Sequence, residues 1–249
     1  MPPLGMHMTL ARELASQINH AAIDAQPGLF YLGASAPDIR AMTRQDRRHT
    51  HFFDLDDFEE QSGAARLFQE HPELANARSD ETAAFLCGYL SHLEMDEAWI
   101  TDVYRPCFGE RSPLKGDVLA NVLDRVLQHE LDRREIDACG GVDAIRDELL
   151  GATVREVVGF IDDDDLTRWR EVAAEVLCRE RTWERFGRFA GRHLKAYGVI
   201  ESEDDISHFL RNVPDLLDQS IREVTQERLE SFRERARRRA VEAAREFLS

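Results

Sequence analysis

The sequence lacks closely spaced cysteines and any apolar run long enough to cross a membrane. The four cysteines form neither a thiolate zinc motif nor a redox pair, and we interpret them as free thiols: Cys87, Cys107, Cys139 and Cys178. The start of the chain lacks the charged residues and the apolar stretch of a secretory signal. No segment approaches the roughly 20 apolar residues that a transmembrane helix needs. These absences predict a cytoplasmic protein.

The sequence also lacks a balance of charge, because its 48 acidic residues outnumber its 32 Lys and Arg residues. The 249 residues carry a formal net charge of −16 at pH 7, so long-range repulsion argues against a nucleic-acid backbone or an anionic membrane surface as a partner. An acidic balance suits a protein that holds divalent cations, although solvated Asp and Glu are its commoner cause. With 43% hydrophobic residues, the chain is long enough for a substantial core, which we expect to form one domain.

Several patterns typical of other folds and enzymes are missing from the sequence. Apolar and polar residues do not alternate over a stretch long enough to predict a sheet. The sequence has no His-Glu-x-x-His motif, no His-Asp dipeptide, no glycine-rich phosphate loop and no Gly-x-Ser-x-Gly nucleophile elbow. The paired Glu-x-x-His motifs of di-iron bundles are missing as well. These enzyme classes are therefore disfavoured.

Helical periodicity is present along most of the chain, because apolar residues recur at intervals of three and four. It predicts an all-α fold. Helices are expected over Thr9–Ile18, Asp80 to about Arg105, Asp117–Ala138, Val142–Leu150, Asp163–Arg179, Thr182–Tyr197, Asp204–Leu210 and Pro214–Ser249. Pro106 is expected to stop the central helix. Gly28–Ile39 is expected to be a buried turn, and Arg44–Glu60 a loop with helical turns.

The second half of the chain offers no candidate catalytic residue. The aspartates at 162–165 are interpreted as the start of a helix, where free N–H groups favour negative charge. The long charged helix expected over 214–249 is either a packed outer helix or the contact of a homodimer. Gly140–Gly141 divides the predicted single domain, 1–249, into a metal-site half, 1–139, and a helical extension, 140–249.

Candidate metal ligands occur in the first half. His92 and Asp96 are four residues apart in an expected helix, so their side chains project from one face. Asp38, His51 and His7 precede them in separate segments. A set of two imidazoles and two carboxylates suits zinc, and manganese or iron is also chemically reasonable.

Three of these segments resemble the zinc-dependent phospholipase C family, which is related to bacterial alpha-toxins and to single-strand-specific zinc nucleases. Leu32–Ile39 resembles the family's Gly-x-x-x-Pro-Asp segment. His51–Asp54 is similar to its His-Phe-aromatic-Asp segment, and Phe85–Asp96 to its Leu-Gly-x-x-x-His-x-x-x-Asp helix. The resemblance covers roughly residues 1–135. It implies a multi-helix bundle like that of phospholipase C and the zinc nucleases, with a C-terminal helical extension.

The resemblance also implies one to three zinc ions. A first ion would take Asp38, His51, His92 and Asp96. A second would take His7 and a bridging Asp96. A third position carries Asp102 where the family has a histidine, and His129 has no clean match to the family's later His and Glu.

The function implied by the resemblance is hydrolysis of a phosphoester by a metal-bound hydroxide, with Asp38 as the candidate general base. The expected substrate is a small phosphoester or a lipid head group. The alternative is a helical binding or scaffold protein that retains a single or degenerate metal site. Completeness of the second and third metal positions distinguishes these two hypotheses.

Overall fold

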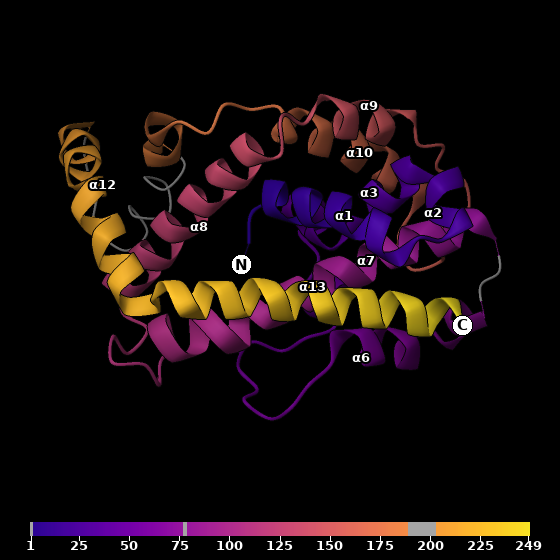
Figure 1. Ribbon diagram of the computed structural model, residues 1–249, viewed down its shortest axis with the longest axis horizontal. Coiled ribbons are helices and arrows are strands. Elements are labelled where there is room, and N and C mark those ends of the chain that lie inside the picture. The colour runs from indigo at the N-terminus through magenta and orange to yellow at the C-terminus, as the bar shows by residue number, and fades with distance from the viewer. Residues whose placement is uncertain (1, 77–78, 189–202) are drawn as a thin grey trace.

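The computed structural model describes residues 2–76, 79–188 and 203–249, and within these ranges every regular element is a helix (Figure 1). The predicted all-α fold is confirmed. No helix in the described ranges is both long enough and apolar enough to span a membrane.

The helices have the following bounds along the chain: α1 Leu4–Ile18, α2 Ala21–Ala25, α3 Pro27–Ser35, the 3-10 helix η1 Ala36–Ile39, α4 Arg40–Thr43, α5 Arg48–His51, α6 Gly63–Glu70, the 3-10 helix η2 Pro72–Asn76, α7 Asp80–Ala98, the π-helix η3 Trp99–Phe108, α8 Val118–Ala138, α9 Asp143–Gly151, α10 Asp163–Leu177, α12 Glu203–Val224 and α13 Gln226–Leu248. The helix expected over 182–197 is helical from 183 to 188, and its remainder lies outside the described residues.

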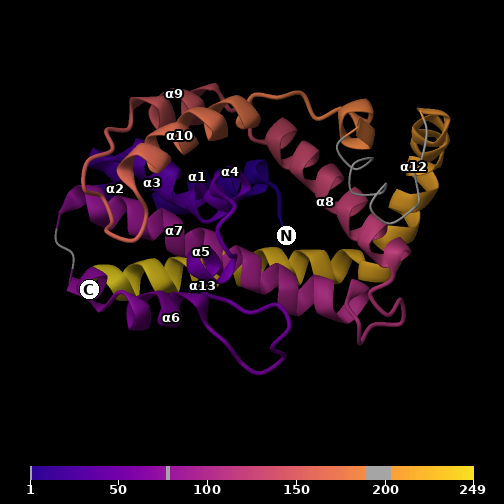
Figure 2. The ribbon, with the colours of Figure 1, turned by 180° about the vertical axis from the view of Figure 1, so that it is seen from behind.

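The central element is α7, which is buried from Thr82 to Ala98. A helix buried on all sides needs cover from several neighbours. In this chain α3 crosses α7, and α13 runs alongside it in both views (Figure 1 and Figure 2). The Asp117 carboxylate caps α8, since it accepts a hydrogen bond from the Ala120 amide at 2.8 Å. The Asp162 carboxylate caps α10 in the same way.

Two glycines allow α3 and α7 to cross closely. A Cβ atom on Gly33 would lie 1.9 Å from the Phe85 carbonyl oxygen, and one on Gly88 would lie 1.9 Å from that of Phe30. Real Cβ atoms do not approach an oxygen this closely, so any side chain at either position would force the helices apart. The crossing therefore sets the distance between the end of α3 and the His92 turn of α7.

The structure corrects two boundaries near the start of the chain. The first helix begins at Leu4 instead of Thr9, whose hydroxyl donates to the Met6 carbonyl in the helix interior. The segment 27–35, expected to be part of a buried turn, is the helix α3. Pro27 sits at its first position, where a missing N–H costs nothing. The turn expectation failed because glycine inside a helix is acceptable where a second helix packs on it.

The end of the central helix also differs from expectation. Pro106 does not stop it, because α7 continues directly into the π-helix η3, which contains Pro106 and ends at Phe108. A proline breaks an α-helix through its missing N–H and its clash with the carbonyl four residues earlier, and the wider π turn changes that register.

The C-terminal segment is two helices rather than one. Thr225 has a positive φ of 64° and separates α12 from α13, and Pro214 lies inside α12. The apolar side of α13 packs inside the same chain, with five buried residues: Leu229, Phe232, Ala236, Ala240 and Ala244. Phe232 meets Trp99 edge to face at 5.2 Å between ring centroids. This stripe therefore fits the packed-helix interpretation, and a homodimer stays a prediction.

A buried ion cluster joins α13 to α7. The Arg239 guanidinium lies 2.6 Å from the Glu94 carboxylate and 3.1 Å from that of Glu97. The other Glu97 oxygen accepts a hydrogen bond from the Gly63 amide. Burial, with the charge of Glu94 beside it, raises the pKa of Glu97 to about 7. Two carboxylates share one guanidinium here, so the cluster carries one excess negative charge when both are ionised.

This cluster predicts a pH-dependent stability. The folded chain holds the Glu97 proton up to about pH 7, whereas an ordinary glutamate loses it near 4.5. The contribution of the protonated Glu97 to the free energy of unfolding is therefore complete at low pH. About 3 kcal/mol of it is lost as the pH rises through this window. In Glu97→Gln, which imitates the protonated acid, the free energy of unfolding relative to wild type is expected to rise by that amount between pH 4.5 and 8. Urea unfolding of metal-free protein measures it.

The exposed Glu246→Gln on α13 serves as the control and should leave the pH dependence of stability unchanged. If the free energy of unfolding changed with pH in the same way for Glu97→Gln and for wild type, Glu97 would be ionised in the folded chain throughout this window.

Candidate metal centre

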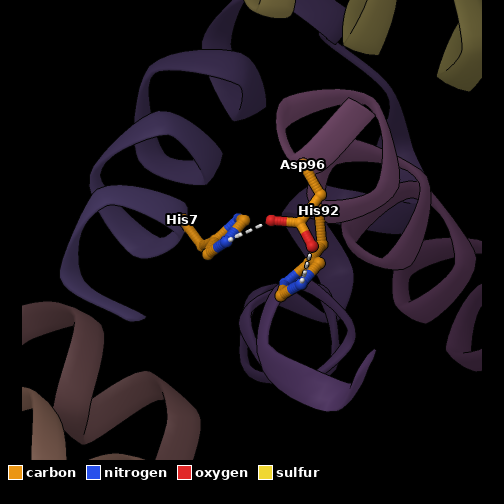
Figure 3. Close-up of side chains that lie close together, drawn as sticks. All are labelled: His7, His92 and Asp96. Carbon is orange, nitrogen blue, oxygen red and sulfur yellow. Dashed lines mark ion pairs between the residues drawn. The ribbon is translucent and has the colours of Figure 1, made fainter. Parts of the chain in front are cut away.

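Four separate elements bring five of the predicted ligands together. They come from the first turns of α1, from η1, from the end of α5 and from α7: His7, Asp38, His51, His92 and Asp96. We call these five residues the ligand cluster. Figure 3 shows three of them, with one oxygen of the Asp96 carboxylate facing His7 and the other facing His92.

The Asp96 carboxylate is the centre of the cluster. Its Oδ1 lies 3.4 Å from His7 Nε2, and its Oδ2 lies 3.3 Å from His51 Nε2 and 3.8 Å from His92 Nε2. Asp38 Oδ1 is 3.6 Å from His51 Nε2. The imidazoles of His7 and His92 are stacked at 3.7 Å. Two triads have ligand atoms within 4.8 Å of one another: His7, His92 and Asp96, and Asp38, His51 and His92.

Hydrogen bonds determine which nitrogen of two histidines faces the cluster. His92 Nδ1 lies 2.9 Å from the Ala34 carbonyl, which can only accept, so Nδ1 carries the proton. His51 Nδ1 lies 3.0 Å from the Thr50 hydroxyl, and this hydrogen bond holds the ring with Nε2 toward the cluster. Both rings are therefore held with Nε2 pointing inward, and in His92 this nitrogen carries the lone pair that a metal ion needs.

The electrostatics keep the cluster in the protonation state that binds cations. Burial and the adjacent His7 lower the pKa of His92 to about 3, so its imidazole is neutral at pH 7. Burial alone would raise the pKa of Asp38, but the nearby imidazoles of His51 and His92 outweigh it and lower that pKa to about 2. At Asp96 the adjacent imidazoles of His51 and His7 likewise outweigh burial and hold the pKa well below its usual range. Both carboxylates are ionised.

The cluster has more buried polar atoms than partners. Both ring nitrogens of His7, the Nε2 atoms of His51 and His92, and Asp96 Oδ1 are buried without a hydrogen bond. An unsatisfied buried polar atom costs about 1–3 kcal/mol, so a group of them in one place needs an explanation. A divalent cation satisfies such nitrogen and oxygen donors at once, and the donor set matches the preferences of zinc. The residues present therefore fit a metal ion.

Sequence reasoning missed one residue of the site. Arg47 Nη2 donates to Asp96 Oδ2 at 2.9 Å, and Nη1 donates to the Phe53 carbonyl at 3.0 Å. The Arg47 side chain is only 11% exposed. The sequence feature that could have identified Arg47 is its position four residues before His51, since this spacing places both side chains on one face of a helical turn.

The two remaining predicted ligands lie elsewhere. Asp102 lies on the π-helix η3, and its carboxylate is paired with Arg235 of α13 at 2.6 Å. His129 of α8 packs against the rings of Trp183 and Phe186, each at 4.7 Å between centroids. Neither residue belongs to a group of described residues that could share a metal ion with the ligand cluster.

The fold and the ligand cluster define an all-helical protein with a buried His/Asp site suited to a divalent metal. A protein-family model described as zinc dependent phospholipase C matches residues 6–97. The match spans less than half of the chain but includes the whole ligand cluster, and Asp102 and His129 lie beyond it. The resemblance inferred from the sequence is thus confirmed over this range, which ends short of residue 135. No curated protein and no solved structure matches the chain.

Proposed function

We propose that this protein is a metal-dependent hydrolase of a phosphoester. The observation that carries the proposal is the convergence of inward-facing, unpartnered nitrogen and oxygen atoms on Asp96, within the segment similar to the phospholipase C family. The ligand cluster would hold the metal, with zinc as the expected ion. When bound, the metal supplies Lewis acidity toward water and the phosphoryl oxygens. A small phosphoester or a lipid head group is the proposed substrate.

The exposure of the side chains supports an approach of the substrate from the Asp38 side. The side chains of His7, His51, His92 and Asp96 are at most 2% exposed, whereas that of Asp38 is 32% exposed. We therefore expect a substrate to approach the cluster beside Asp38. Asp38 is also ionised, with His51 beside it, so it is the residue proposed to accept a proton from water.

The buried imidazoles of the cluster are held in fixed orientations beside the two carboxylates. His51 Nε2 is shared between the two carboxylates, 3.6 Å from Asp38 Oδ1 and 3.3 Å from Asp96 Oδ2. The Ala34 carbonyl and the Thr50 hydroxyl orient His92 and His51 before any ligand binds. A preorganised donor set of this kind avoids the cost of ordering side chains during the reaction.

The first test is the zinc content of protein purified without chelators, measured by elemental mass spectrometry beside activity on soluble phosphomonoesters, phosphodiesters and phospholipid vesicles. His51→Ala is expected to lose metal and activity together, because it removes an inward-facing nitrogen. The exposed His49→Ala, two residues away, is the matched control and should keep both.

Each outcome decides between the two hypotheses drawn from the sequence. Bound metal with hydrolysis of one phosphoester class supports the proposed function. A protein free of metal, or full activity in His51→Ala, contradicts it and favours a binding or scaffold role. The cytoplasmic location stays a prediction from the sequence.

A further inference from the structure

Two features of the ligand cluster limit how many cations it can hold. The first is that His92 belongs to both metal-competent triads. Its Nδ1 carries a proton that is committed to the Ala34 carbonyl, so only the single lone pair on Nε2 is available. One lone pair binds one metal ion. A cation that takes His92 together with Asp38 and His51 leaves a second cation only His7 and Asp96.

The second feature is the guanidinium of Arg47. A carboxylate that bridges two metal ions uses one oxygen for each. At Asp96, Oδ1 is without a hydrogen bond, but Oδ2 already accepts the 2.9 Å hydrogen bond from Arg47. A charge-assisted bond between largely buried partners is among the stronger polar interactions in proteins, so it competes with a metal for that oxygen.

Counting charges leads to the same limit. Asp38 and Asp96 contribute two negative charges, and Arg47 contributes one positive charge at 2.9 Å from Asp96. One divalent cation brings the site to a single positive charge, which an anionic phosphoester can neutralise. A second divalent cation would bring it to three positive charges in a buried site, where uncompensated charge is costly.

We propose that the ligand cluster holds one divalent cation and that Arg47 supplies the second positive charge at Asp96. The inference rests on the proposed metal-dependent function and specifies its stoichiometry. Arg47 is a positioning residue in this arrangement: it orients the shared carboxylate and occupies the place of a second ion.

Titration of metal-free protein with Zn²⁺ alone tests the proposal, by calorimetry and by elemental analysis after dialysis. Wild type is expected to bind one ion per chain. Arg47→Met removes the positive charge and releases Asp96 Oδ2, so it should bind the first ion at least tenfold more tightly and take up a second. A residue that merely supported the fold would show the opposite effect, because loosening Asp96 would weaken metal binding.

Arg47→Lys is the matched control. It keeps the charge, and we expect one ion per chain with an affinity within a few-fold of wild type. If Arg47→Met does not fold, as judged by helical circular dichroism, Arg47→Gln replaces it, because glutamine removes the charge while keeping an N–H donor. Co²⁺ absorption spectra of each variant report the number of ligands independently of activity.

The possible results separate this inference from the proposed function. Two or three ions per wild-type chain, together with phosphoester hydrolysis, would overturn the one-ion site and leave the hydrolase intact. Unchanged or weaker binding in both neutral variants would overturn the role of Arg47. A wild-type chain that binds no metal would overturn both proposals.

Discussion

Replacing His92 with alanine is expected to remove the bound metal and to lower phosphoesterase activity by more than about 100-fold. Loss of a residue that only orients a metal ligand already costs up to about 100-fold, so loss of a ligand itself should cost more. His92 is the one ligand shared by both triads, so no alternative three-ligand set remains among the described residues. Elemental mass spectrometry of the purified variant measures the metal, and hydrolysis of the substrate class found for wild type measures the activity.

His92→Ala also leaves the Ala34 carbonyl without its donor, which costs about 1–3 kcal/mol of stability by itself. His92→Asn separates the two effects, because its side-chain N–H can still donate to Ala34 while the inward-facing nitrogen is gone. We expect the asparagine variant to be more stable than the alanine variant and equally devoid of metal. The control is His208→Ala on an exposed part of α12, which should behave as wild type. Retention of metal and full activity in His92→Asn would remove His92 from the site.

Adding one methyl group at Gly88 is expected to destabilise the protein by about 3 kcal/mol, the upper part of the range for overpacking a core. Alanine is the better helix former by about 1 kcal/mol, but its Cβ would lie 1.9 Å from the Phe30 carbonyl oxygen and 2.8 Å from the Ala34 amide. Helix α3 must therefore move away from α7. Chemical unfolding of Gly88→Ala measures the loss of stability.

The same displacement would reach the metal site. Ala34 orients His92, and Asp38 follows four residues later on η1, so a shift of α3 should weaken Zn²⁺ binding as well. Gly151→Ala is the matched control: this glycine ends α9 with nothing within 4 Å of an added Cβ, and we expect a change of no more than about 1 kcal/mol in either direction. If Gly88→Ala were as stable as Gly151→Ala, the close helix crossing would not exist in solution.

Local pattern was enough for the all-helical class, for most of the helices and for most of the ligand cluster. His92 and Asp96 share a helix face because of their spacing, and the imidazole and carboxylate chemistry of His7, Asp38 and His51 marked them as candidates without any coordinates. These are properties of residue type and of separation along the chain, which a sequence states directly.

Other features depend on contacts between segments far apart in the chain. Asp102 had the spacing of a ligand, but Arg235 of α13 pairs with its carboxylate, and the two residues are 133 positions apart. Glycines that predicted a turn instead allow α3 to pack on α7. Whether such a residue binds a metal, forms an ion pair or fills a crossing depends on which helix lies opposite.

The sequence by itself determined the all-helical class, the acidic character and the residues able to bind a metal, because helical periodicity, charge and ligand chemistry are local properties. The tertiary structure alone decided that five of the seven candidates come together in one cluster, that Arg47 holds one oxygen of the Asp96 carboxylate, and that the chain bends at Thr225 so that α13 covers α7. These outcomes follow from packing, in which a buried polar group must find its partner from whichever element the fold places beside it.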